Sequence, residues 1–224
     1  GSGENMTFQQ YEKVISEWVA VKVRPIGVAL STGGKPDDFK TPYFPMLLDG
    51  FIGVSDSFEA MKFSLTLLES DFPVSRKVER EKYLEYVIHA FLGDCYVLKE
   101  LLKTYVTTIQ RVYSKKLTNI HVKSILKPVF DSLTNGIEDL MNIRNVHVHQ
   151  ERFKGGGLKD LNVLATLSQH DELLAQRSNE AFQMVLQGWR EYMAEVIRIY
   201  TGLLDDAFSH IAEIVIENGA VREP

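Results

Sequence analysis

The chain has 224 residues, of which 45% are hydrophobic and 25% are charged, a globular composition that excludes a disordered or collagen-like protein. It carries 25 basic and 30 acidic side chains, and this net charge of −5 argues against a dedicated coat for nucleic acid or membrane. No apolar run approaches the ~20 residues of a membrane-spanning helix, and the single cysteine, Cys95, suits a reducing compartment. We therefore expect a cytoplasmic protein without a membrane partner, and residues 1–5 resemble the remnant of an expression tag.

Apolar residues at spacings of three and four predict helices along most of the chain. The first is expected over 7–23 with Thr7 as its N-cap, although the valines near its end also alternate as in a short strand. Residues 24–50 hold four of the seven prolines and four glycines, which predicts an irregular insertion. Further helices are expected over 55–69, 78–113, 119–149, 158–174 and 179–218, with Pro128 kinking or splitting one of them and Gly219 ending the last.

No segment alternates for long enough to build a sheet, and no repeat period is present. The predicted fold is therefore all-α, an antiparallel bundle of four to five long helices with a Pro/Gly-rich N-terminal insertion. The expected organisation is a single domain over residues 1–224.

The stretch that carries chemistry follows the apolar stripe of the 119–149 helix. That stripe steps by four and three, and its members are Leu126, Phe130, Leu133, Ile137 and Leu140. The next inward position is Arg144. Because a buried guanidinium without a partner is strongly unfavourable, Arg144 needs an anion or acceptors, which a groove open to a phosphate or a partner subunit supplies.

His149 lies five residues beyond Arg144, which is about 140° around a regular helix, so the two side chains share no face while the helix continues. Either the helix ends before the glycines at 155–157, or a second subunit completes the site. An Arg that binds phosphate and a His that transfers protons near neutral pH are the smallest set of side chains expected to cleave RNA. The helix dipole also favours an Arg and a His near a helix C-terminus, without any function.

The sequence Arg144-Asn145-Val146-His147-Val148-His149 resembles the R-(N/D/H)-xxx-H form of the R-x4–6-H signature of the HEPN superfamily. HEPN proteins are similar to this chain in being all-α bundles with the motif toward the end of a long inner helix. The resemblance implies a homodimer that brings two motifs into one cleft. It further implies a metal-independent endoribonuclease of a toxin–antitoxin, anti-phage or CRISPR-associated system, with Arg144 binding the phosphate, His149 as the catalytic base and Asn145 orienting the site.

A second indication of function is a span without acidic residues, from Leu101 to Phe130. We expect RNA phosphates to be bound there by Lys115, Lys116, Lys123 and Lys127, two of which share a helix face. Tyr105 and Tyr113 stand near these lysines in the sequence. A solvated loop with flanking helix ends is the alternative interpretation.

No metal site or cofactor is expected, because no carboxylate cluster or Cys/His set with the spacing of metal ligands stands near the motif. The alternative function, from a different class, is a non-catalytic helical binding or scaffold module, such as the partner of a nucleotidyltransferase or antitoxin. A helical sensor of small ligands, built on the same Arg-lined groove, is the third.

Overall fold

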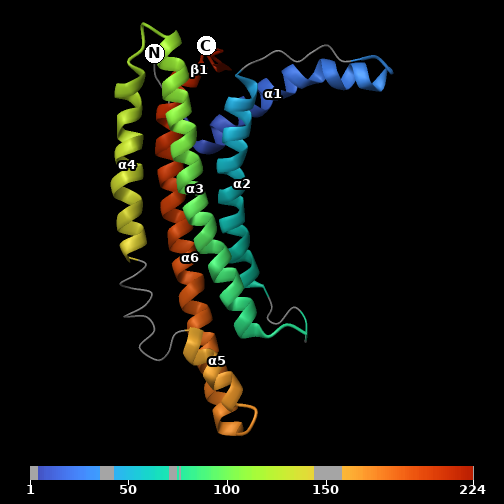
Figure 1. The fold of residues 1–224 in the computed structure, drawn as a ribbon, viewed down its shortest axis with the longest axis vertical. Coiled ribbons are helices and arrows are strands. Elements are labelled where there is room, and N and C mark those ends of the chain that lie inside the picture. Colours follow the sequence, from blue (N-terminus) through green and yellow to red (C-terminus); the bar gives the residue numbers. More distant parts are fainter. Residues whose placement is uncertain (1–4, 36–42, 71–74, 76, 144–157, 224) are drawn as a thin grey trace. The chain divides into compact units, whose positions relative to one another are not determined.

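The computed structural model describes residues 5–35, 43–70, 75, 77–143 and 158–223. Within these ranges it is all-α, as the periodicity predicts, and the only strands form one hairpin of two residues each (Figure 1). The helices are α1 (Phe8–Ser31), α2 (Phe44–Glu69), α3 (Arg80–Lys116), α4 (Val122–Ile143), α5 (Leu158–Leu167) and α6 (Glu172–Val215). Five of these are long, which confirms the predicted helical bundle.

The chain divides into two compact units, and neither is a continuous segment. Unit 1 comprises residues 1–56, 98–134 and 200–224, and unit 2 comprises residues 57–97 and 135–199. Four helices, α2, α3, α4 and α6, therefore contribute residues to both units. The single domain expected from the sequence stays a prediction.

Helix α1 begins as its sequence predicts and ends later. The Thr7 hydroxyl accepts a hydrogen bond from the Gln10 amide at 3.2 Å, and the Gln10 side chain accepts one from the Thr7 amide at 2.9 Å, a complete capping box. The helix then continues through Pro25 to Ser31, so the predicted end near residue 23 is wrong. Pro25 leaves the Val21 carbonyl without its helical donor, and water can replace that donor because this part of α1 is exposed.

The expected irregular insertion over 24–50 is also wrong at its other end, because α2 already begins at Phe44. Gly50 belongs to this helix and packs against a ring: a Cβ there would lie 2.5 Å from Cδ2 of Tyr105. The glycine that suggested a loop instead allows α2 to approach α3 closely.

Aromatic side chains fill the core of unit 1. Four rings surround that of Phe208, with centroids between 4.8 and 6.0 Å from its own: Phe8, Tyr11, Phe51 and Tyr105. The Asp205 carboxylate accepts a hydrogen bond from the Phe8 amide at 3.0 Å, which joins the start of α1 to α6. The first two turns of α1 are therefore fixed by both packing and polar contacts.

The C-terminal end of unit 1 is a hairpin rather than the predicted continuation of α6 to residue 218. Strand β1 (Ile216–Glu217) pairs antiparallel with β2 (Ala220–Val221), with Ile216 opposite Val221. Asn218 and Gly219 both have positive φ, 51° and 76°, as a tight hairpin turn requires. Gly219 is thus a turn residue and not the predicted helix terminator.

Polar contacts in unit 2 hold the ends of its helices. Arg80, at the start of α3, donates to Glu81 and to Asn179 of α6, each at 2.8 Å, and its guanidinium lies 4.3 Å from the Phe182 ring centroid. Near the end of α2, the Leu68 carbonyl accepts a hydrogen bond from Nε of Arg190 at 2.6 Å. Cys95 is buried, as expected for a small apolar side chain on the stripe of α3.

None of the helices in the described ranges has a stretch long and apolar enough to cross a membrane.

Candidate functional site

The motif residues Arg144, Asn145 and His149 lie outside the described residues. Helix α4 ends at Ile143, so the motif starts at the next position of the chain. The roles that the resemblance implies for these three residues therefore stay predictions.

The described part of α4 changes one argument for Arg144. Leu126 and Leu133 are buried as expected, but Phe130 is only half-buried, and Val129 is buried in its place. From Val122 the buried positions are thus 122, 126, 129 and 133. Steps of three and four carried forward along the sequence from 133 reach position 143 as readily as position 144. The apolar stripe no longer singles out Arg144, whose assignment now depends on the motif alone.

The four lysines predicted to bind RNA, which we call the lysine cluster, all belong to unit 1 and are exposed. Lys115 and Lys116 form the end of α3, where the helix dipole favours cations, and Lys123 and Lys127 lie on α4. Figure 1 shows the end of α3 and the start of α4 joined by a short link. The structure therefore brings the lysines of two helices to one end of unit 1.

The lysine cluster has few internal partners. Lys127 forms an ion pair with Asp131 at 2.7 Å, one turn along α4, and both side chains are largely exposed. No ion pair to a described residue involves Lys115, Lys116 or Lys123. Three cations are thus available to an external anion, whereas Lys127 must first exchange a carboxylate, which in an exposed pair costs only about 0–1 kcal/mol.

The two tyrosines near the lysine cluster in the sequence are core residues. Tyr105 and Tyr113 are 2% and 0% exposed, so neither ring can stack on a base. The Tyr113 hydroxyl donates to the Arg222 carbonyl at 2.6 Å and joins α3 to the C-terminal hairpin segment. Burial raises the pKa of both tyrosines above the ordinary value, which keeps them neutral.

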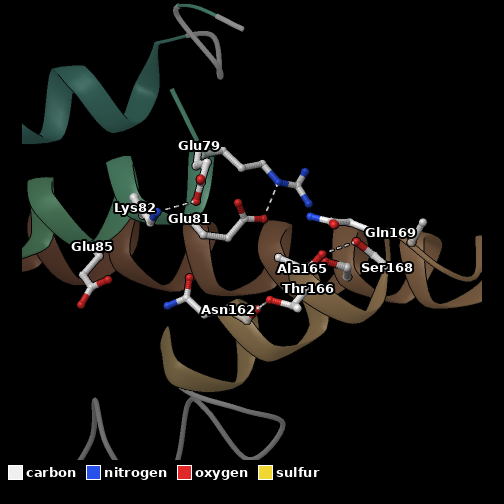
Figure 2. Close-up of a pocket in the computed structure, with 12 residues that line it drawn as sticks. Glu79, Glu81, Lys82, Glu85, Asn162, Ala165, Thr166, Ser168 and Gln169 are labelled. Atoms are coloured by element: carbon white, nitrogen blue, oxygen red, sulfur yellow. Dashed lines mark hydrogen bonds and ion pairs between the residues drawn. The ribbon is translucent and has the colours of Figure 1, made fainter. Parts of the chain in front are cut away.

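A polar pocket of about 790 Å³ lies in unit 2, between the start of α3, α5 and the start of α6 (Figure 2). Figure 2 shows the charged side chains of α3, among them Glu81 and Glu85, on one side of the pocket, and Asn162 and Thr166 of α5 on the other. Glu79 pairs with Lys82 at 3.0 Å, and Glu81 pairs with Arg80 at 2.8 Å.

The charges of this pocket disfavour a phosphate. Its lining holds three carboxylates and two cations, and both cations already have carboxylate partners. Glu85 forms no ion pair with any described residue. An RNA backbone is therefore better accommodated by the lysine cluster than by this pocket. The sequence signal for the pocket is the charged run from Glu79 to Lys82 at the start of α3, and the apolar periodicity of that helix does not point to it.

Comparison with protein-family models, with curated proteins and with solved structures finds no match to this chain.

Proposed function

We propose that this chain is a metal-independent endoribonuclease of the HEPN type, acting as a toxin or anti-phage effector. The observation that carries the proposal is the R-N-xxx-H motif at Arg144–His149, directly after α4 of an all-α fold. HEPN proteins carry the motif toward the end of a long helix, and in this chain it follows the last residue of α4 along the sequence.

In the proposed reaction, His149 removes the proton of a ribose 2′-hydroxyl, and the resulting oxygen attacks the adjacent phosphorus. The bond from phosphorus to the 5′-oxygen breaks, and that oxygen takes a proton. Arg144 stabilises the negative charge that develops on the phosphate oxygens, and Asn145 orients the side chains of Arg144 and His149. The products are a 2′,3′-cyclic phosphate and a 5′-hydroxyl end, and no oxidant, reductant or metal takes part.

The lysine cluster supports the same proposal through binding. Exposed cations without carboxylate partners neutralise RNA phosphates and release counterions, independently of base sequence. Lys115, Lys116 and Lys123 meet this condition among the described residues, in a chain whose net charge is −5. The homodimer belongs to the proposal as well, because two motif copies in one cleft provide the Arg and the His that diverge on one regular helix.

The test is cleavage of a single-stranded RNA by the wild type and by Arg144→Ala and His149→Ala. Loss of a charge clamp or a general base slows such reactions by about 10²–10⁴-fold, so both variants should show no cleavage in a gel assay. His147→Ala is the matched control: it removes an imidazole from the same segment but has no role in the proposed reaction, so it should cleave at the wild-type rate. Equal cleavage by all four proteins contradicts the assignment.

A non-catalytic binding or scaffold module, for instance the partner of an antitoxin or a nucleotidyltransferase, is the second candidate. The lysine cluster favours it equally, since anion binding requires no catalytic group. RNA that is bound but never cleaved by the wild type would select this candidate over the endoribonuclease.

A further inference from the structure

The second half of α1 is an apolar helix of which the rest of unit 1 covers one face only in part, so that Val19, Lys22, Ile26 and Ala29 are half-buried. Eight of the 13 residues in 19–31, which we call the α1 arm, are Val, Ile, Leu or Ala. Beyond Ile15 no residue of α1 is buried, and Val21, Val28 and Leu30 are 71%, 55% and 64% exposed. Figure 1 shows this part of α1 extending away from the other helices of unit 1. A helix that is apolar on most of its circumference is normally covered.

The composition of the α1 arm also disfavours an isolated helix. It contains Pro25 and Gly27 together with several β-branched residues, all of which lower helix propensity. A segment of this length is marginal as a free helix even with good helix formers. Inside the chain, the arm has polar contacts near its start, where Lys22 and the Trp18 indole both bind the Glu223 carboxylate. The remainder needs a packing partner.

An apolar groove of about 430 Å³ lies between α1 and α2 of unit 1, and the first turn of the α1 arm forms part of its wall. Its apolar lining is Ile15, Val19, Ala20, Val23, Leu48, Phe51 and Ile52. Two acidic residues, Glu12 and Asp56, also line it, and no basic residue does. Neither carboxylate forms an ion pair with a described residue. The groove thus offers an apolar surface flanked by unpaired negative charges.

The charge of the α1 arm is complementary to that of the groove. Residues 19–35 contain Lys22, Arg24 and Lys35 and no acidic residue. Lys22 is paired with Glu223 at 2.8 Å, whereas Arg24 is exposed and has no ion pair within the described ranges. An apolar helix with a basic side chain is the kind of ligand that an apolar groove with acidic flanks binds, and this chain carries both surfaces.

We propose that two copies of this chain pair through these surfaces, with the α1 arm of each copy seated in the α1–α2 groove of the other. The contact is isologous: Arg24 of one copy faces the partner's Glu12 and Asp56, and the reverse contact is identical. The two arms run antiparallel, and α1 and α2 of both copies form a four-helix contact. Self-complementarity in apolar character and charge favours a second copy over an unrelated protein.

This inference deepens the proposed function, on which it rests only for the homodimer, by naming the surfaces that join the two copies; these lie on α1 and α2 and include neither the motif nor the lysine cluster. Loss of cleavage in Arg144→Ala or His149→Ala with the dimer retained concerns the motif alone, whereas a monomeric wild type concerns the pairing alone. The two claims are therefore separately testable.

The experiment measures the mass of the full chain in solution by sedimentation velocity over 0.1–100 μM, a range that brackets micromolar pairing. The wild type should be a dimer at the upper end and dissociate on dilution. Leu30→Glu changes only the arm, and Ile52→Glu changes only the groove, and both side chains are exposed within one copy. Each variant should weaken pairing at least 100-fold while retaining the circular dichroism of the wild type.

The matched control is Met184→Glu, which changes an apolar side chain of unit 2 that is 75% exposed, and it should pair like the wild type. Charge reversal tests the register: Arg24→Glu alone should weaken pairing, and Arg24→Glu combined with Glu12→Lys and Asp56→Lys should restore it. In the wild type, amide exchange over 19–31 should be slower at 100 μM than at 0.1 μM. A monomer at every concentration, or a dimer unaffected by both glutamate variants in the arm and groove, overturns the proposal.

Discussion

The hydroxyl groups of Tyr11 and Tyr105 lie 2.7 Å apart in the core of unit 1, and both side chains are at most 2% exposed. The Tyr105 hydroxyl also donates to the Leu47 carbonyl at 3.2 Å. Because Tyr105 has a single proton to give, Tyr11 is the donor in the shorter bond. One polar chain therefore joins α1, α3 and α2, and Tyr105 is its middle member.

Replacing Tyr105 by Phe should destabilise the protein more than replacing Tyr11 by Phe. Tyr105→Phe removes both hydrogen bonds and leaves the Tyr11 hydroxyl proton without its acceptor in the core, whereas Tyr11→Phe leaves the bond from Tyr105 to Leu47 intact. We expect losses of about 2–4 kcal/mol and about 1 kcal/mol in the free energy of unfolding. Urea denaturation of both variants measures the difference, and equal losses would show that the chain is not directional.

Stability should fall at alkaline pH. Burial raises the pKa of Tyr11, Tyr105 and Tyr113 above the ordinary value of tyrosine. A raised pKa in the folded state contributes stability that is complete below about pH 10 and is lost as the pH rises through the folded value. We expect absorbance at 295 nm to show these phenols ionising together with the loss of helical circular dichroism. Ionisation of all nine tyrosines before any helix is lost would contradict their burial.

Two glycines of unit 1 should respond oppositely to alanine. Gly50→Ala places a methyl group 2.5 Å from the Tyr105 ring and should cost about 1–3 kcal/mol. Gly202→Ala is the matched control, because Gly202 occupies an exposed position of α6 and no surrounding atom lies within 4 Å of the new methyl group. It should stabilise the fold by about 0.5–1 kcal/mol. Thermal unfolding of both variants is the measurement. A neutral Gly50→Ala would mean that α2 and α3 can move apart freely.

The sequence predicts the helices wherever the apolar period is sustained and the boundary residue makes a local contact. Thr7 and Gln10 form the capping box next to Phe8, so the start of α1 can be read from four consecutive residues. The fold class follows from the same regular spacing in α3 and α6.

The differences from the sequence expectation arise where tertiary surroundings decide. Pro25 and Gly50 both have low helix propensity, yet both lie in helices. Pro25 lies in an exposed helical turn of α1, where water can bond to the carbonyl that lacks a donor. Gly50 is held in α2 by its close contact with the Tyr105 ring. In α4 the steps of three and four permit either Val129 or Phe130 on the stripe, and only packing selects Val129. The pair Asn218-Gly219 is typical of a two-residue hairpin turn, whereas the apolar spacing before it predicts a helix that continues to residue 218. The structure has the hairpin.

Replacing three lysines of the lysine cluster should weaken RNA binding without loss of stability. Lys115, Lys116 and Lys123 are exposed and form no ion pair with described residues, so a triple change to Gln removes three phosphate contacts and little else. The slope of log K against log salt should fall by about 2 for single-stranded RNA, at roughly 0.7 per contact. The control is a triple change of lysines elsewhere, Lys13, Lys62 and Lys82, each of which already pairs with a glutamate. Equal slopes for both triple variants would exclude the cluster as the binding surface.

The most direct test of the proposed function is the chemistry of the RNA ends that the wild type produces. If His149 activates the 2′-hydroxyl and Arg144 stabilises the phosphate, mass spectrometry should find a 2′,3′-cyclic phosphate and a 5′-hydroxyl at every cut, in EDTA as in its absence. The same RNA with a 2′-deoxy sugar at the cleaved position should remain intact, because it lacks the nucleophile. Cleavage of the deoxy substrate, or products with a 5′-phosphate, would contradict the proposed mechanism.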